Sequence, residues 1–260
     1  MLKGYSQPLT PGGTSSLVTA PPWHFVGNVL AIEYTANPEA VAEFLPERLN
    51  YSSNECCVYF IEWQYASETG EEHLDPIRSQ YKETLFLLSA ELDGEPISYC
   101  PFIWVDQDIS MMRGLIQGWP KQLGNTWMTR ASTLPSKAAS MEGSGGRFGA
   151  SLSTRDRRLA EARVTLHEQT QALPSPGFAR AINLRHFPEL SKSAGEKPVI
   201  RGLVQLNSRD VAISTIWKGD ALLEIMEHPQ IELSRLKPLT VNAGYRFSMA
   251  LTVDDLILLE

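Results

Sequence analysis

The chain has 260 residues, of which 43% are hydrophobic and 20% charged, and its net charge at pH 7 is −7. This length is enough to bury a large core, and the acidic balance argues against nucleic-acid binding, which needs clustered Lys and Arg. No segment reaches the roughly 18–20 consecutive apolar residues of a membrane span, and the N-terminus lacks the apolar region of a secretory signal. We therefore expect a cytoplasmic globular protein that binds neither nucleic acid nor a membrane.

The cysteines and histidines predict neither a disulfide framework nor a metal site. The three cysteines are an odd number that includes one adjacent pair, Cys56 and Cys57, and no CxxC motif is present. None of the five histidines is spaced with another as a metal-binding pair. The sequence also lacks a dinucleotide-binding or phosphate-loop motif. We expect reduced thiols, no metal and no cofactor.

The first half of the chain begins irregularly and then becomes rich in β-type segments. Residues 1–22 are rich in Pro, Gly, Ser and Thr, which is typical of an irregular arm. A helix is predicted over residues 37–49, with Asn37 as its N-cap and Pro38 at the first helical position. β-strands are predicted on both sides of this helix, at residues 28–36, 56–67, 81–92 and 95–106.

A helical pattern returns at residues 108–120, and Gly118 followed by Pro120 is a strong helix stop signal. Apolar residues recur there near the helical period, at Ile109, Met112, Ile116 and Trp119. β-type runs dominate the remainder, apart from a second helix predicted over residues 222–228. Because no repeat or linker is visible, residues 23–260 are expected to form a single α+β domain that is mostly antiparallel β.

The most constrained stretch of the sequence is GWPKQLG, residues 118–124. Pro120 fixes its own φ angle and pushes Trp119 toward an extended conformation, while a glycine on each side allows sharp bends. This pattern places Lys121 at a defined point just after a helix end. Spacing alone favours an exposed lysine in a capped turn over a functional one.

A second unusual segment is YKETLFLL, residues 81–88. The period-two rule places Tyr81, Glu83, Leu85 and Leu87 on one face of a strand. A carboxylate on an apolar face is costly unless it is paired or neutralised. Glu83 could instead lie exposed on an edge strand, and the segment by itself does not decide between the two.

Together the two segments resemble those of the acetoacetate decarboxylase superfamily, in which an aromatic-Pro-Lys segment carries the Schiff-base lysine and a Glu on an earlier strand faces it. Trp119, Pro120 and Lys121 match the first motif, and Tyr81 and Glu83 match the Tyr-x-Glu of the second. The resemblance extends through the FLPERL and IWKGDALLEIMEH segments to most of the chain. It implies a β-barrel or cone with a few short helices, a homo-oligomer, and Lys121, Glu83 and Tyr81 as the catalytic residues.

Catalysis by Lys121 requires that burial lower its pKa, so that the amine rather than the ammonium is present. Trp119 and Met111 would supply that apolar environment and contact the substrate. Gln117, four residues before the lysine, could hydrogen-bond a bound carboxylate or carbonyl. Arg113 is a candidate for binding a substrate carboxylate, although a surface position or a structural ion pair is the commoner role of such an arginine.

Three departures from the decarboxylase pattern indicate a divergent branch of the superfamily. The decarboxylases carry a second lysine after the first, but this chain has Gln122, so burial alone is expected to lower the pKa of Lys121. The first strand, HFVGNVLAI, lacks the arginine associated with the substrate carboxylate in the decarboxylases. The third departure is the neutral amide of Gln117. Members of the branch with similar residues use the Schiff base for aldol chemistry on pyruvate.

We therefore expect a Schiff-base lyase that acts on a small 2-oxo or 3-oxo acid. The preferred reaction is condensation of pyruvate with an aldehyde co-substrate followed by loss of water. Decarboxylation of acetoacetate or another β-keto acid is the first alternative. A non-catalytic protein that binds 2-oxo acids, and a structural β protein with Lys121 exposed, are the alternatives from other classes.

Overall fold

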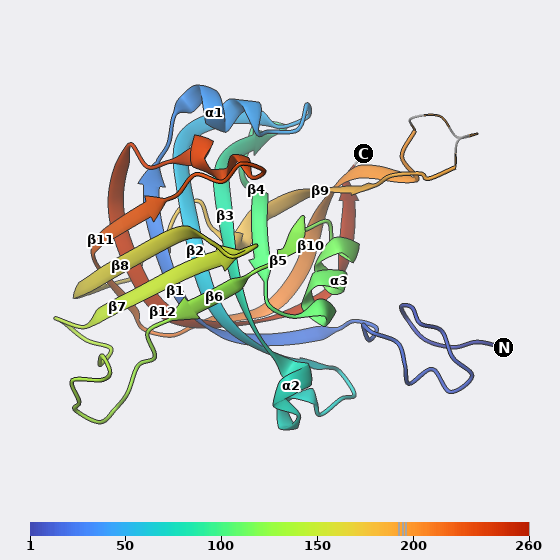
Figure 1. Cartoon of the computed structure of the whole chain (residues 1–260), viewed down its shortest axis with the longest axis horizontal. Coiled ribbons are helices and arrows are strands. Elements are labelled where there is room, and N and C mark those ends of the chain that lie inside the picture. Colours follow the sequence, from blue (N-terminus) through green and yellow to red (C-terminus); the bar gives the residue numbers. More distant parts are fainter. Residues whose placement is uncertain (192, 194, 196, 260) are drawn as a thin grey trace.

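The computed structural model describes residues 1–259 except 192, 194 and 196, and long β-strands dominate it (Figure 1). The α-helices are α1 (Pro38–Glu43), α2 (Pro76–Ser79) and α3 (Asp108–Ile116). Short 3-10 helices are η1 (Glu72–Leu74), η2 (Phe178–Arg180) and η4 (Glu232–Leu236). The strands are β1 (Trp23–Thr35), β2 (Asn50–Ser67), β3 (Gln80–Leu92), β4 (Glu95–Val105), β5 (Lys121–Leu123), β6 (Asn125–Met128), β7 (Arg147–Thr154), β8 (Arg157–Thr170), β9 (Ala181–Phe187), β10 (Ile200–Ile213), β11 (Ile216–Ile225) and β12 (Thr240–Leu259).

The strands form one curled, mixed sheet. Because β1 pairs with both β2 and β12, the order β1-β2-β3-β4-β9-β10-β12 closes into a ring, and a branch leaves β12 through β11, β8 and β7 to β6. Within the described residues β4 pairs in parallel with β5 and β9, whereas the other neighbouring strands are antiparallel. The predicted fold class is thereby confirmed: α+β, mostly antiparallel, with a barrel- or cone-like sheet and a few short helices.

Both faces of β1, β2 and β3 are buried along much of their length, and they contribute to the two larger apolar cores of the described residues. Along β1, Leu30 and Ile32 belong to a core shared with the branch of β7 and β8, while Val29 and Ala31 point the other way. The second core is built mostly from ring strands and lies inside the ring. Alternating side chains of one strand therefore contribute to different cores. The second core surrounds the site described below.

The first predicted helix is confirmed at its start and is shorter than expected at its end. The side chain of Asn37 accepts hydrogen bonds from the backbone N–H groups of Glu39 (2.8 Å) and Ala40 (3.2 Å), which is the geometry of an N-cap. The helix ends at Glu43, not at residue 49. Pro46 explains the difference, because a proline disfavours helical backbone in the residue before it.

The second predicted helix, over residues 222–228, is wrong. Residues 222–225 belong to β11, which pairs with β8 up to Ile225 opposite Ala160. Exposure alternates along this segment, since Leu223 and Ile225 turn inward and Leu222 and Glu224 face solvent. Pairing with a neighbouring strand outweighs the helical propensity of Leu and Glu.

The first strand begins at Trp23, and the preceding residues 1–22, all described, contain only the isolated bridge between Lys3 and Thr10. Val18 anchors this segment, because its side chain is fully buried against Trp23 and Tyr65. The division into an arm (1–22) and one domain (23–260) stays a prediction, and residue 260 lies outside the described residues. None of the helices in the described part of the chain combines the length and apolarity needed to span a bilayer.

Candidate active site

A tight turn after α3 positions Lys121. The chain leaves β4, forms α3 and returns in β5, where Lys121 lies opposite Ile103 of the parallel strand β4. The turn depends on Gly118, whose φ of +84° is a backbone conformation that glycine adopts without strain. A Cβ at this position would also lie 2.6 Å from a methyl group of Val204. Lys121 is 9% exposed, so the alternative of a surface lysine in a capped turn is wrong.

Glu83 lies directly against the lysine. Its Oε2 atom is 2.7 Å from Lys121 Nζ, and Trp63 Nε1 donates a hydrogen bond to Oε1 at 3.0 Å. β3 is flanked by β2 and β4, so Glu83 occupies an interior strand and is 5% exposed. The alternative of an exposed carboxylate on an edge strand is wrong. A buried carboxylate is acceptable here because a cation and an indole N–H satisfy its two oxygens.

The remaining surroundings of the lysine come from α3 and β3. Lys121 Nζ donates a hydrogen bond to Ser110 Oγ at 3.1 Å and lies 5.4 Å from the centroid of the Tyr81 ring. Tyr81 is buried, and burial above all raises the pKa of its phenol, with the charge of Glu83 adding to the effect. The phenol is therefore neutral at physiological pH and is available as a hydrogen-bond donor.

The pKa of Lys121 lies below its ordinary value of 10.5, chiefly because burial disfavours the ammonium. Glu83 opposes this shift through its negative charge and its hydrogen bond, and the positive charge of Arg113 adds to the lowering. The expectation that burial alone must lower this pKa, because Gln122 replaces a second lysine, is therefore wrong. A like charge is present, and Arg113 of α3 supplies it.

Arg113 is itself an unusual residue, because it is 1% exposed and has no carboxylate partner among the described residues. Its guanidinium carbon lies 4.0 Å from the Tyr65 ring centroid, 5.0 Å from that of Phe25 and 5.7 Å from that of Tyr81. Neither Nη1 nor Nη2 has a hydrogen-bond partner in the described part of the protein. Cation–π contacts stabilise the charge, but they leave the donor groups free. The common roles of a surface or ion-paired arginine do not apply here.

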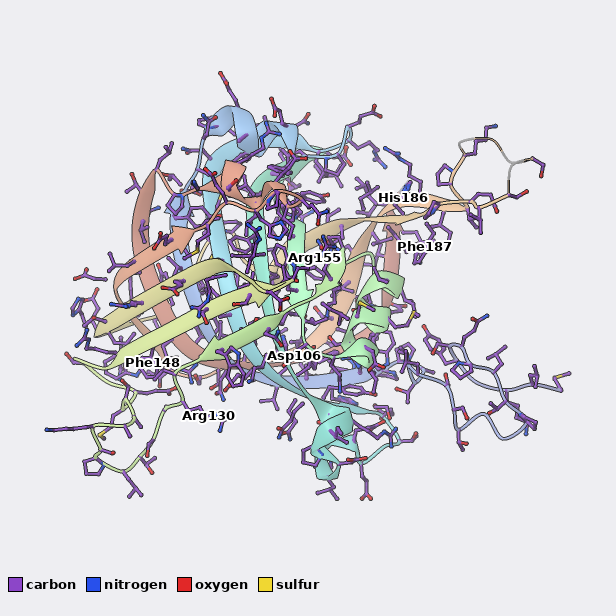
Figure 2. The ribbon with its side chains drawn as sticks, viewed as in Figure 1. Asp106, Arg130, Phe148, Arg155, His186 and Phe187 are labelled. Atoms are coloured by element: carbon purple, nitrogen blue, oxygen red, sulfur yellow. The ribbon has the colours of Figure 1, made fainter. Side chains whose placement is uncertain are left out.

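A cavity of about 70 Å³ opens beside the lysine. Of the residues proposed from sequence, Tyr81, Glu83, Gln117, Trp119 and Lys121 line it together. Arg113 is not part of its lining. Met111 lines a separate groove, whose lining also includes Lys121, Asp106 and Arg155; Asp106 and Arg155 are labelled in Figure 2. The other walls are side chains that sequence reasoning did not propose: Phe25, Trp63, Ile103, Phe178, Leu206, Met249, Leu251 and Val253.

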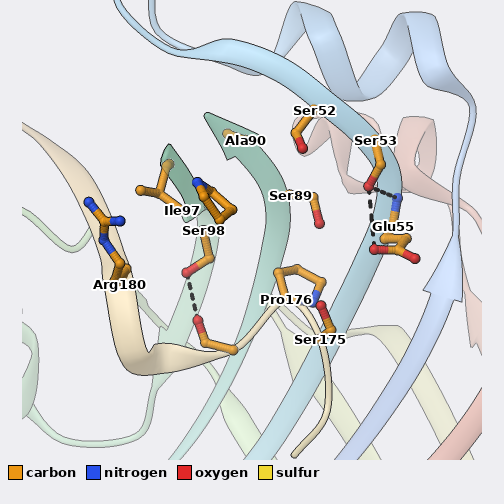
Figure 3. A pocket seen from close by; sticks show the side chains of 12 residues that line it. Ser52, Ser53, Glu55, Ser89, Ala90, Ile97, Ser98, Ser175, Pro176 and Arg180 are labelled. Atoms are coloured by element: carbon orange, nitrogen blue, oxygen red, sulfur yellow. Dashed lines mark hydrogen bonds between the residues drawn. The ribbon is translucent and has the colours of Figure 1, made fainter. Parts of the chain in front are cut away.

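Elsewhere in the described part of the chain, these features do not occur together in one cavity. A pocket of about 320 Å³ lies elsewhere, and Ser98 and Arg180 are among its lining residues (Figure 3). Arg180 is paired with Glu95. Among the described residues, no three His, Cys, Asp or Glu side chains are grouped so that they could hold a metal ion. The lysine cavity therefore combines the perturbed pKa, the buried ion pair and the apolar walls that indicate an active site.

Gly114 creates the space that the lysine side chain occupies. A Cβ at this position would lie 2.2 Å from Lys121 Cδ. Ala normally stabilises a helix relative to Gly by about 0.5–1 kcal/mol, but here overpacking should dominate at about 1–3 kcal/mol. We expect Gly114→Ala to lower the urea midpoint of unfolding and to displace the amine from Glu83. Gly202→Ala is the matched control, because no atom lies within 4 Å of its Cβ position. An unchanged midpoint for Gly114→Ala would contradict this packing.

Comparison with known proteins gives one family and several similar structures. The family model described as acetoacetate decarboxylase matches residues 6–260. The enduracididine biosynthesis enzyme MppR, in complex with the condensation product of pyruvate and imidazole 4-carboxaldehyde, is 38% identical with a TM-score of 0.93, covering 99% of this chain and 97% of that one. The pyruvate complex of MppR has the same identity and TM-score, covering 100% and 98%. An acetoacetate decarboxylase-like enzyme from Sphingomonas wittichii RW1 has a TM-score of 0.90 at 22% identity, covering 99% of both chains, and shows the shared fold. A comparison with curated protein sequences finds no match.

Proposed function

The chain belongs to the acetoacetate decarboxylase family, and from this premise we propose that it is a lyase in which Lys121 forms a Schiff base with pyruvate or a closely related 2-oxo acid. The observation that carries the proposal is the buried Lys121–Glu83 pair, at 2.7 Å, facing a cavity of about 70 Å³. By itself this cavity is well below the roughly 300–1,000 Å³ of pockets that enclose a drug-sized ligand. It suits a substrate of a few heavy atoms.

The preferred reaction is condensation of the 2-oxo acid with an aldehyde, followed by dehydration. Two structures at 38% identity support it, because one holds pyruvate and the other a condensation product of pyruvate with an aldehyde. Gln122, which follows the lysine where the decarboxylases carry a second one, favours the same reaction. Decarboxylation of a β-keto acid remains the second candidate, because the family match favours it and the same iminium would serve it.

The reaction begins when the neutral amine of Lys121 attacks the ketone carbon of pyruvate and water leaves, giving an iminium. Glu83 removes a proton from the methyl group, and the electron pair forms an enamine. The enamine carbon bonds to the aldehyde carbon, and the aldehyde oxygen takes up a proton. Loss of a second proton and of the new hydroxyl as water forms the carbon–carbon double bond. Hydrolysis then returns the ketone and frees the amine, so that the net change is pyruvate plus aldehyde to the unsaturated 2-oxo acid plus water.

We assign the substrate carboxylate to Gln117, which lines the cavity, with the positive charge of Arg113 acting on it from outside the lining. The Nη groups of Arg113 are buried and without partners, which is destabilising unless an anion pairs with them. Gln117 lies one helical turn further along α3 and lines the cavity. The Tyr81 ring lies within 6 Å of both the Lys121 Nζ atom and the Arg113 guanidinium carbon. A carboxylate that enters the cavity would therefore complete the charge balance of the site.

Borohydride trapping tests the proposal directly. Incubation with pyruvate and sodium borohydride is expected to add a reduced pyruvyl group to the peptide that contains Lys121, as measured by mass spectrometry. Pyruvate plus an aldehyde should then generate the ultraviolet absorbance of a conjugated enone. Absence of the Lys121 adduct would refute the Schiff-base mechanism. Rapid release of CO₂ from acetoacetate would favour the decarboxylase instead, and an adduct without turnover would indicate a 2-oxo-acid-binding protein.

The pH dependence of adduct formation should reveal the charge of Arg113. Replacing Arg113 with Gln removes a positive charge that lowers the pKa of Lys121, so this pKa should rise toward its ordinary value. We expect the midpoint of the pH profile for borohydride trapping to move to higher pH. Acetone is the appropriate reagent, because an uncharged ketone does not need a carboxylate-binding residue.

The matched control is Arg130→Gln, which removes an exposed arginine and should leave the midpoint unchanged. Urea denaturation establishes that both variants are folded. A midpoint for Arg113→Gln equal to that of the unaltered protein would show that the charge of Arg113 does not lower the pKa of Lys121. The homo-oligomeric state and the cytoplasmic location stay predictions.

A further inference from the structure

A second, larger cavity adjoins the lysine cavity. Its volume is about 470 Å³. The two share five lining residues: Trp119, Phe178, Leu206, Met249 and Leu251. These shared side chains place the larger cavity directly beside the lysine cavity.

The larger cavity is lined by apolar side chains. No charged residue of the described chain belongs to its lining, and its two hydroxyl side chains are those of Tyr59 and Ser208. Tyr59 directs its hydroxyl into hydrogen bonds with the carbonyl oxygens of Pro174 (3.3 Å) and Pro176 (3.0 Å). Ser208 is exposed at the rim. The interior thus offers little that would hold a charged or strongly polar group.

The wall formed by residues 173–178 is held in place by side chains from three strands. Besides the bonds from Tyr59, the backbone N–H of Ser175 donates to Glu33 Oε1 at 2.7 Å. Ser98 Oγ donates to the carbonyl of Gly177 at 2.7 Å, an interaction visible in Figure 3. The Phe178 ring packs edge-on against Tyr59, with centroids 4.6 Å apart. The cavity is therefore preformed rather than opened by the ligand.

A different cleft also borders the lysine cavity, but it has another chemical character. It measures about 890 Å³, shares Trp63 and Tyr81 with the lysine cavity, and includes the charged side chains of Glu62, Lys82, Asp106 and Arg130. An aldehyde with a charged or hydroxylated substituent would suit this cleft. The polarity of the aldehyde substituent therefore decides which of these two spaces, the apolar cavity or the charged cleft, suits it better.

We propose that the 470 Å³ cavity binds the substituent of the aldehyde co-substrate, and that this substituent is uncharged and apolar or aromatic. The inference rests on the proposed function, because it assumes an enamine on Lys121. The aldehyde carbon must reach the enamine carbon beside Lys121, where about 70 Å³ is available. The rest of a larger aldehyde must then occupy an adjoining space. The apolar cavity shares more of its wall with the lysine cavity than the polar cleft does.

Competition among aldehydes tests this inference on the full-length protein. With pyruvate fixed, kcat/KM is measured for benzaldehyde, hexanal, propanal and glyoxylate by chromatography of the products. Benzaldehyde and hexanal are expected to exceed glyoxylate by about tenfold or more, which is within the range that apolar pockets discriminate. From propanal to hexanal, kcat/KM should rise about threefold to fourfold for each added methylene. Preference for glyoxylate would overturn the inference.

Val211 allows a substitution that avoids the residues around the lysine. It lines the larger cavity and is 58% exposed, so Val211→Glu should fold normally. This variant is expected to lower kcat/KM for benzaldehyde about tenfold or more, because a carboxylate would then face an apolar ligand. Val199→Glu is the matched control, since Val199 is 62% exposed and is not in the lining of either cavity.

Trapping with pyruvate alone separates this inference from the proposed function. Both glutamate variants should form the borohydride-stable adduct as readily as the unaltered protein, because the lysine cavity is unchanged. If the unaltered protein forms no adduct, the proposed function fails and the inference fails with it. If the adduct forms but Val211→Glu leaves kcat/KM for benzaldehyde unchanged, only the assignment of the apolar cavity is overturned.

Discussion

Lys121→Met is expected to abolish both the borohydride-stable adduct with pyruvate and the condensation reaction. Methionine fills similar space but has no amine, so the iminium that accepts the electron pair cannot form. Turnover should fall toward the uncatalysed rate, a loss of about 10⁶-fold or more if the enzyme is typical. The measurements are mass mapping of the trapped peptide and the rate of enone formation. Lys82→Met is the control, because Lys82 lies in the adjacent polar cleft and over the Trp127 ring.

The same substitution should destabilise the fold, and this effect can be separated from the loss of chemistry. Glu83 would remain buried without its cation, which typically costs about 3–5 kcal/mol. The double variant Lys121→Met, Glu83→Gln removes both charges and should recover most of the stability while remaining inactive. Urea denaturation at neutral pH compares the two. An adduct in either variant would show that another amine is the nucleophile.

The strands could be predicted from sequence because they depend on local patterns, whereas the functional pair Lys121 and Glu83 needed a family resemblance as well. Alternation placed Tyr81 and Glu83 on one face of β3, and the Pro120 and Gly118 stop signal placed Lys121 after a helix. The pairing of these two segments across β4 was inferred from a family resemblance. No local rule specifies that β5 lies beside β4 and brings the amine to the carboxylate.

The inward face of α3 shows where apolar periodicity fails. Ile109, Met112 and Ile116 recur at helical spacing, yet all three are only partly buried. The buried face instead carries Ser110, Arg113, Gly114 and Gln117. These residues have the same spacing, three and four apart, but they are small or polar because this face borders the lysine. The sequence signal that could have identified this buried face is a stripe of small and polar residues at helical spacing next to a constrained lysine.

The roles of Arg113 and of the apolar walls required the tertiary structure. A sequence cannot show that an arginine lacks an ion-pair partner, because this depends on which residues surround it in space. The rings around Arg113 include Phe25 and Tyr65, which are distant in the chain. The walls formed by Phe178 of η2 and Met249 of β12 come from elements more than 50 residues from Lys121. Their spatial arrangement follows from the closure of the ring by β1 and β12.

Glu83→Gln is expected to separate Schiff-base formation from proton transfer. Glutamine keeps the shape of the side chain but cannot accept the methyl proton, and a positioned general base typically contributes about 10²–10⁴-fold. We expect a loss of this size both in condensation and in exchange of the pyruvate methyl protons with D₂O. The second reaction is followed by NMR without an aldehyde, so it reports enamine formation alone.

Adduct formation should respond to Glu83→Gln in the opposite direction. The negative charge of Glu83 raises the pKa of Lys121, so its removal lowers this pKa further and increases the fraction of neutral amine at a given pH. Trapping of acetone by borohydride should therefore persist, with its pH midpoint shifted to lower values. Glu62→Gln is the matched control, since this carboxylate lines the polar cleft on β2 and does not contact the amine. Methyl exchange at the normal rate in Glu83→Gln would assign the base to another group. Loss of the acetone adduct would instead show that Glu83 positions the lysine rather than transferring protons.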